Sequence, residues 1–184
     1  ICVLWCGYWF YMVRYIEQQI GGWFARNPAD VQNISVRGFP YQFRVHLTAP
    51  YVADPATDVA WSAPDITIIA LAYDPGHLIV LFPGVQTIHT HGQKFEIKTH
   101  DLRASLVADI SAPHILHRIN AAGGRIEIWQ NGENVLQMSD IRIALQQKPR
   151  QPFKYRAGLQ AQDIGKIADL GDLSAGVARL DAHM

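Results

Sequence analysis

The sequence predicts a mainly β protein: an N-terminal anchor and amphipathic helix, then a long antiparallel meander whose sheet curls into a groove and is built from repeated strand units. Short apolar or alternating runs follow Asp30 at intervals of roughly 8–12 residues, and turn residues separate them. No helical apolar pattern lies between these runs, which argues against a doubly wound α/β fold. The length of 184 residues suits one domain with a full core.

Residues 1–13 form an uncharged opening run that contains five aromatic residues and ends at Arg14. Its tryptophans and tyrosines, followed by a cation, are typical of the interface end of a membrane-spanning helix. We therefore interpret 1–13 as the remnant of a membrane anchor and expect the N-terminus to be incomplete. A buried helix and a signal-peptide remnant stay open as alternatives.

Residues 14–28 continue as an amphipathic helix. Ile16, Ile20, Trp23 and Phe24 repeat at the spacing of one helix face, and Asn27-Pro28 marks the end. Gly21-Gly22 weakens the helix. Its apolar stripe suits either a membrane surface or a cap on a sheet, and we favour the cap.

Residues 29–184 form the predicted β-rich domain, which we expect to be incomplete at its C-terminus. Asn131-Gly132 is the strongest hairpin signal, and we also expect hairpins at His91-Gly92 and Gly123-Gly124. Ile164 to Met184 is left as a helix or an interrupted strand. The candidate strands are Asn33–Arg37, Gln42–Thr48, Asp65–Tyr73, Leu78–Phe82, Val85–Thr90, Lys94–Thr99, Leu102–Ala108, Arg118–Ala121, Arg125–Gln130, Val135–Met138, Ile141–Gln146 and Lys154–Gln160.

An internal repeat supports a stacked β unit. The segment Asp101–Leu106 returns as Asp140–Leu145, and Asp65–Ala70 is a fainter copy. Each copy places an aspartate at a turn in front of a strand-like run.

Two predicted strands, Ile66–Tyr73 and Leu78–Phe82, are apolar on both faces. In a meander with one solvent-exposed face, apolar and polar residues should instead alternate along each strand. Either a helix or a second sheet covers the second face, or the sheet curls into an apolar trough that could hold acyl chains. The residues expected to line such a groove are Ile66, Ile68, Ala70, Leu78, Val80 and Phe82.

Charge and motif content exclude several function classes. Lys plus Arg and Asp plus Glu balance at 16 each, so we expect no nucleic-acid partner. Charged residues make up 17%, against roughly 25% in soluble domains, which favours membrane association. No hydrolase motif occurs, both cysteines lie in the opening run, and we expect no cofactor. A metal site is a weak alternative, with His89, His91 and His100 as candidate ligands and His114 and His117 as a separate pair.

Several segments carry a family resemblance: Ser35–Phe43, Leu47–Pro50, Trp61–Pro64 and Ala70–Pro75, together with Gly7-Tyr8-Trp9. They resemble an alphaproteobacterial envelope family known as domain of unknown function 2125, and the likeness spans about Gly7 to Leu159. The resemblance implies an inner-membrane anchor with the β-rich part in the periplasm, and it supplies no catalytic residues. A looser architectural likeness links the meander to AsmA-like grooved proteins that handle envelope lipids. The signature residues are Gly38, Phe39, Pro40, Trp61, Pro64 and Pro75, which we interpret as structural, with Phe39 and Phe43 as core anchors.

Three functional hypotheses follow. The first is a membrane-anchored, non-catalytic periplasmic β domain that binds envelope lipid through an apolar groove. The second is a protein-interaction scaffold of the cell envelope, in which another protein covers the second apolar face of the sheet. The third is a metal-dependent hydrolase.

Overall fold

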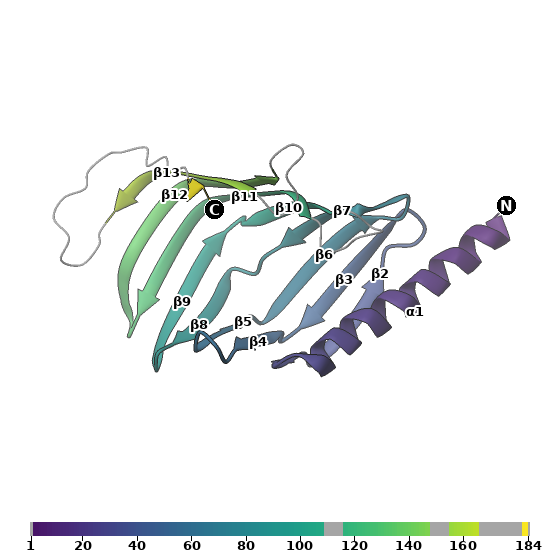
Figure 1. Ribbon diagram of the computed structural model, residues 1–184, viewed down its shortest axis with the longest axis horizontal. Helices are drawn as coiled ribbons and strands as arrows, with labels where there is room; N and C mark the ends of the chain where they lie inside the picture. Colours follow the sequence, from purple (N-terminus) through teal and green to yellow (C-terminus); the bar gives the residue numbers. More distant parts are fainter. Residues whose placement is uncertain (1, 109–115, 148–154, 166–181, 184) are drawn as a thin grey trace.

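A computed structural model describes residues 2–108, 116–147, 155–165 and 182–183, and within them it contains one helix and one sheet (Figure 1). The helix α1 spans Cys2–Arg26. Every pairing in the 14-stranded sheet is antiparallel, so the predicted class, mainly β with a long antiparallel meander, is confirmed. The strands are β1 Ala29–Asp30, β2 Asn33–Arg37, β3 Gln42–Thr48, β4 Tyr51–Asp54, β5 Val59–Ser62, β6 Asp65–Leu71, β7 Asp74–Leu81, β8 Val85–Thr90, β9 Gln93–His100, β10 Arg103–Ala108, β11 Leu116–Gln130, β12 Glu133–Gln147, β13 Tyr155–Gly165 and β14 Ala182–His183.

Most of these strands are halves of longer strands that bend where they cross one line. The pairs β3 and β4, β5 and β6, β7 and β8, and β9 and β10 are each separated by only two or three residues. The ladder continues across the bends: the Ala49 amide donates to the Pro64 carbonyl and the Thr99 amide donates to the Gly84 carbonyl, both at 2.8 Å. We call this line the fold line.

The fold line divides the sheet into two halves. The β3 half comprises β2, β3, β6, β7 and β10, with residues 116–123 of β11, 141–147 of β12 and 155–160 of β13. The β4 half comprises β1, β4, β5, β8 and β9, with residues 125–130 of β11 and 133–139 of β12. Each long strand pairs with its chain neighbours, as the predicted meander requires.

The bends have a local cause in the backbone. Ala49, Asp101 and Asp140 have positive φ angles of 47°, 55° and 47°. One left-handed residue inserted into a strand acts as a bulge, which bends the strand and shifts its alternation by one position. The three strands that lie between these cross the line at Pro64, at Pro83-Gly84 and at Gly123-Gly124, residues that interrupt a regular strand.

The internal repeat marks this line. Asp101 and Asp140 occupy equivalent positions. Each has a positive φ angle and lies at the fold line, where the chain enters the β3 half. Aspartate tolerates the left-handed region better than most non-glycine residues. The third copy begins at Asp65, directly after Pro64, so all three aspartates lie at the fold line, where the chain enters the β3 half.

One face of the β3 half and one face of the β4 half share an apolar cluster. Val52 and Trp61 of the β4 half pack into the same cluster as Val45 and Ile66 of the β3 half. The sheet therefore curls about the fold line, and one face of both halves lines a common trough. We call this the concave face and the opposite one the convex face.

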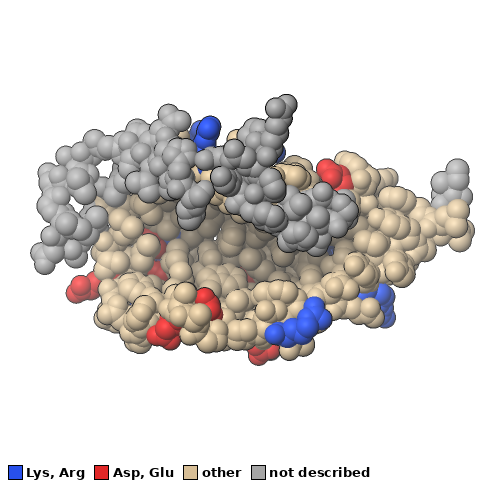
Figure 2. Space-filling view, viewed as in Figure 1, with Lys and Arg blue, Asp and Glu red and all other residues tan. Residues whose placement is uncertain are grey.

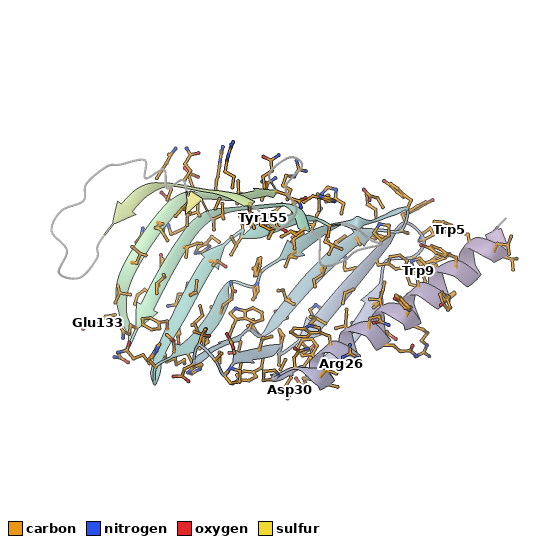
Figure 3. The ribbon with its side chains drawn as sticks, viewed as in Figure 1. Trp5, Trp9, Arg26, Asp30, Glu133 and Tyr155 are labelled. Atoms are coloured by element: carbon orange, nitrogen blue, oxygen red, sulfur yellow. The ribbon has the colours of Figure 1, made fainter. Side chains whose placement is uncertain are left out.

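The helix lies on the concave face at the β2 end of the sheet, at the right of Figure 1. Ile16, Ile20 and Phe24 pack against β3 and β6, so the expected cap on a sheet is confirmed. Trp5 and Trp9 tie the N-terminal part of α1 to the sheet: their Nε1 atoms donate to the carbonyls of Pro40 (3.2 Å) and Gln42 (3.3 Å) (Figure 3).

The helix ends at Arg26, as Asn27-Pro28 predicts, and it runs through Gly21-Gly22 without interruption. α1 runs without a break across the predicted boundary between residues 13 and 14. In the described part of the chain, no helix combines the length and the hydropathy needed to cross a membrane.

Several local predictions differ from the structure. The hairpin predicted at Gly123-Gly124 is wrong, because β11 passes through these residues at the fold line. The strands predicted on its two sides are one strand, and the same holds for the two halves of β12. The hairpins at His91-Gly92 and Asn131-Gly132 are confirmed. The strands β1, β4 and β5 were not predicted, and most of Ile164–Met184 lies outside the described residues.

Candidate functional site

The concave face of the β3 half carries two unbroken rows of apolar residues. In each row, successive residues are direct antiparallel partners, and such partners project from the same face of a sheet. The first row is Val36, Val45, Ile68, Val80, Ala104, Ala121, Ile143 and Leu159. The second row is Phe43, Ala70, Leu78, Leu106, Ile119, Leu145 and Ala157. Polar side chains are absent from both rows of these described strands.

The six candidate groove residues all belong to this face. Ile68 and Val80 are partners in the first row, and Ala70 and Leu78 are partners in the second. Ile66 and Phe82 lie beside them, next to the fold line. The structure thus brings all six together on the floor of the trough.

The helix covers part of this floor. Ile66 is buried, and Ile68, Val80 and Phe82 pack against the cluster to which Phe24 of α1 belongs. Both explanations of the strands that are apolar on both faces therefore apply at the end of the sheet formed by β2, β3 and β6. The sheet curls there, and a helix covers its concave face. Four of the six candidates therefore contribute to a core beneath or beside α1.

Further along the sheet, apolar side chains of the first row are open. Ile143 is 41% exposed and its partner Leu159 is 37% exposed. From Val80 to Leu159 the row crosses four strand spacings, or about 19 Å at the usual separation of neighbouring strands. Figure 2 shows a hollow behind the lower edge of the molecule, with mostly uncharged residues in its visible part.

The β4 half supplies the opposite wall of the trough. Its concave residues include Trp61, Ile88, Phe95, Ile97 and Ile128, linked as direct partners or as alternate residues of one strand. The buried Gln86 lies among them, and its Oε1 accepts a hydrogen bond from Trp61 Nε1 at 3.0 Å. This wall is apolar, and that buried amide has its partner.

The convex face of the β4 half carries charges in pairs. Lys94 lies 3.1 Å from Glu96, and Arg125 lies 3.9 Å from Glu127. Lys98 stands over the Trp129 ring, 4.0 Å from its centroid. Cations and carboxylates thus alternate on this part of the outer surface.

Exposed aromatic residues collect at the free end of the β3 half. Tyr41 and Tyr73 stand at the β2–β3 and β6–β7 connections and are 73% and 74% exposed. The N-terminal half of α1 is held at the same end, because the Tyr8 hydroxyl donates to the Ala72 carbonyl at 3.3 Å. Apolar side chains that α1 leaves exposed there include Val3, Leu4, Phe10 and Tyr11.

The signature residues have structural positions. Gly38 and Pro40 connect β2 to β3, and the Gln42 amide donates to the Gly38 carbonyl at 3.1 Å. Phe39 is 48% exposed and touches Trp9 and Phe10, so its prediction as a core residue is wrong, whereas Phe43 is fully buried. Trp61 and Pro64 lie at the fold line. The composition of Asp74-Pro75-Gly76 predicts a hairpin turn at these residues. This prediction is wrong, because Pro75 lies at the start of β7 and the β6–β7 hairpin turns at Ala72-Tyr73.

The candidate metal ligands do not converge. His91 stands in the β8–β9 turn, where its amide donates to Asp58 at 3.1 Å, and His89 pairs with Lys94 in the ladder. His100 lies six residues beyond Lys94 on β9, about 20 Å away at the usual strand rise. In the described ranges, no three His, Cys, Asp or Glu side chains come close enough to hold a metal ion. His117 contacts Gln147, and His114 lies outside the described residues.

One carboxyl group has a shifted pKa. At the β4–β5 turn, Asp54 accepts hydrogen bonds from the Thr57 hydroxyl (2.8 Å) and then the Ala56 amide (3.0 Å), and these lower the pKa of Asp54 below its ordinary value. Because the folded-state pKa is the lower one, the stabilising effect is present at neutral pH and is lost as pH falls through it.

We expect Thr57→Val to raise the pKa of the Asp54 carboxyl toward the ordinary aspartate range. The reason is that the larger of the two stabilising hydrogen bonds to the carboxylate is removed. An NMR titration of the Asp54 side chain in the wild-type protein and in the variant measures this. An unchanged Asp54 midpoint would show that Thr57 does not set this pKa.

Sequence reasoning missed the extent of the apolar floor. Ala104, Ala121 and Leu159 stand in strands that also carry polar residues on the opposite face, so each strand alone has the pattern of an ordinary alternating surface strand. Only the register joins them into one row. The available signal was the phase of alternation, which shifts at Asp101 and Asp140 and keeps the apolar residues on the same face.

The described residues thus form an open, curled antiparallel sheet with a helix across the end of an apolar trough, which makes this a mainly β protein with a grooved sheet. The model of the family described as "Uncharacterized protein conserved in bacteria (DUF2125)" matches residues 9–184, and the chain belongs to this family. No curated protein and no solved structure matches the chain.

Proposed function

We propose that this protein is a membrane-anchored, non-catalytic component of the bacterial envelope whose β domain lies in the periplasm and binds envelope lipid in the apolar trough. The observation that carries the proposal is the unbroken apolar row from Val36 to Leu159, part of which stays exposed. A monomeric soluble protein rarely exposes a contiguous apolar surface of this kind without a ligand or partner.

The dimensions of the trough suit an acyl chain. The hydrocarbon core of a bilayer is about 30 Å thick, so each leaflet holds chains about 15 Å long. The part of the row beyond Val80 is of the same order, about 19 Å. Each methylene that leaves water for such a surface contributes about 0.8 kcal/mol, so one chain suffices for measurable binding.

The membrane part of the proposal rests on the N-terminal end. The exposed apolar side chains of α1, with Tyr41 and Tyr73 beside them, have the composition of a membrane-interface surface. The periplasmic location is consistent with a β domain in which residues 29–184 contain no cysteine.

Purified without detergent, the full chain is expected to carry co-purified lipid, and Ile143→Asn is expected to reduce the lipid-to-protein ratio several-fold. An amide in the middle of the apolar row would have to be buried without a partner when a chain is bound. Mass spectrometry of the intact protein and of its organic extract measures the ratio.

Ile79→Asn is the matched control. Ile79 is 40% exposed on the convex face, so the same chemical change is made at equal exposure outside the trough. No lipid on the wild-type protein, or equal losses in both variants, would contradict the proposal. A photo-cross-linker at position 143 that captures an envelope protein and no lipid would instead support a scaffold.

A further inference from the structure

The convex face of the β3 half carries several arginines, although the net charge of the whole chain is zero. Direct partners place Arg118, Gln146 and Arg156 in one row across β11, β12 and β13. A parallel row, four residues away along β11, contains Arg103, Ala122 and Arg142, followed by Gln160. Within each row the two arginines are two strands apart, about 10 Å, and all four side chains are exposed.

Small residues fill the space between these rows. The intervening row is Asn120, Ala144 and Gly158, and Ala122 adjoins it. A depression with a cavity volume of about 620 Å³ adjoins this area. Its described lining consists of the convex residues Asn120, Ala122, Arg142, Ala144, Gly158 and Gln160, and of Ala121, Ile143 and Leu159, which stand between them along the strands. Six of these nine residues belong to the convex face, and Arg142 is the arginine among them.

The charge of these arginines is largely uncompensated. Arg103 lies 3.8 Å from Asp101, a residue at the fold line that is itself highly exposed. Asp140 stands at the same line, two residues before Arg142. In the described part of the chain, no carboxylate lies within ion-pair distance of Arg118, Arg142 or Arg156, in contrast to the paired charges of the β4 half.

The residue type is informative as well. Both described lysines, Lys94 and Lys98, lie in the β4 half, whereas every described cation on the convex face of the β3 half is an arginine. The guanidinium group offers planar, paired donors that match two oxygens of a phosphate group. Asn120 and Gln160 add neutral donors at the edge of the same depression.

We propose that this part of the convex face is a binding site for a phosphate-bearing anion. Arg142 lines the depression, and Arg103, Arg118 and Arg156 lie on the same face within one strand or two residues of its lining. The four arginines lie on the face opposite the trough, so the proposal does not depend on lipid in the trough. Their spread leaves room for more than one phosphate, which favours a diphosphate or a phosphorylated headgroup over a single small ion.

Calorimetric titration of the full chain with inorganic pyrophosphate is expected to show saturable binding that weakens as salt is raised. Arg142→Gln and the double variant Arg118→Gln/Arg156→Gln should each weaken it at least tenfold. Arg125→Gln is the matched control: it removes the same group from the same face of β11, but in the β4 half, where Glu127 balances it. Thermal unfolding of each variant confirms that these exposed substitutions leave the fold intact.

Vesicles distinguish the sources of the phosphate. Binding to phosphatidylcholine vesicles that contain phosphatidylglycerol, lost in Arg142→Gln, would assign the site to lipid headgroups, whereas pyrophosphate binding without such vesicle binding would assign it to a soluble phosphate. Either result supports the proposal. No binding of either probe, equal weakening by Arg125→Gln, or arginine-dependent binding of polyglutamate alone would overturn it.

Discussion

Replacing Phe43 with alanine is expected to lower the free energy of unfolding by about 3–5 kcal/mol. Phe43 is only 1% exposed, lies between the sheet and α1, and stacks on Trp9 with ring centroids 5.8 Å apart. Its removal leaves a cavity that neither the sheet nor the helix can fill. Urea unfolding monitored by tryptophan fluorescence measures the change.

Phe39→Ala is the matched control for this prediction. Phe39 also contacts Trp9, with centroids 5.3 Å apart, but its side chain is 48% exposed. Its loss should cost about 0.5–1.5 kcal/mol, the magnitude of an aromatic pair. Similar losses for the two variants would show that α1 does not close a core over Phe43.

Replacing Gly38 with alanine is expected to destabilise the protein strongly and to loosen the β2–β3 connection. Gly38 has a φ angle of 109°, a conformation that residues with a Cβ rarely adopt. An added Cβ would lie 2.8 Å from the Gln42 carbonyl oxygen, and this backbone atom cannot move without breaking the turn. We expect a loss of roughly 2–4 kcal/mol from strain and displaced backbone together, read from thermal unfolding.

Gly92→Ala controls for the change of residue type. Gly92 also has a positive φ angle, 73°, but nothing lies within 4 Å of an added Cβ. A cost of about 1 kcal/mol is expected there, from backbone conformation alone. If Gly38→Ala were no more costly than Gly92→Ala, the close approach to Gln42 would have no energetic importance.

The elements of the fold were largely predictable because they depend on local patterns. The end of α1 at Arg26 follows from Asn27-Pro28, and the β11–β12 hairpin follows from Asn131-Gly132. The bends were not predictable in the same way. Gly123-Gly124 and Asp140 are residues typical of turns, but they lie in the middle of continuous strands. The local sequence does not distinguish a turn that reverses the chain from a bend within a strand.

The candidate trough was predictable only where single strands are dry on both faces. Ile66–Ala70 and Leu78–Phe82 stand out because they lie near α1, where the concave face is covered. Ile143 and Leu159 are single large apolar residues, next to Arg142 and Gln160, and neither alone predicts an apolar surface. The arginines of the convex face are isolated in the sequence, and strand pairing alone brings them into rows.

The meander also determines how the chain can fold. No two residues paired in the described ladders are further apart in sequence than Phe95 and Gln130. Each long strand needs only its predecessor as a template, so loop-closure entropy stays small at every step and the contact order is low for an all-β protein. The sheet can therefore be assembled strand by strand from the α1 end, with each new strand extending the apolar rows as it docks.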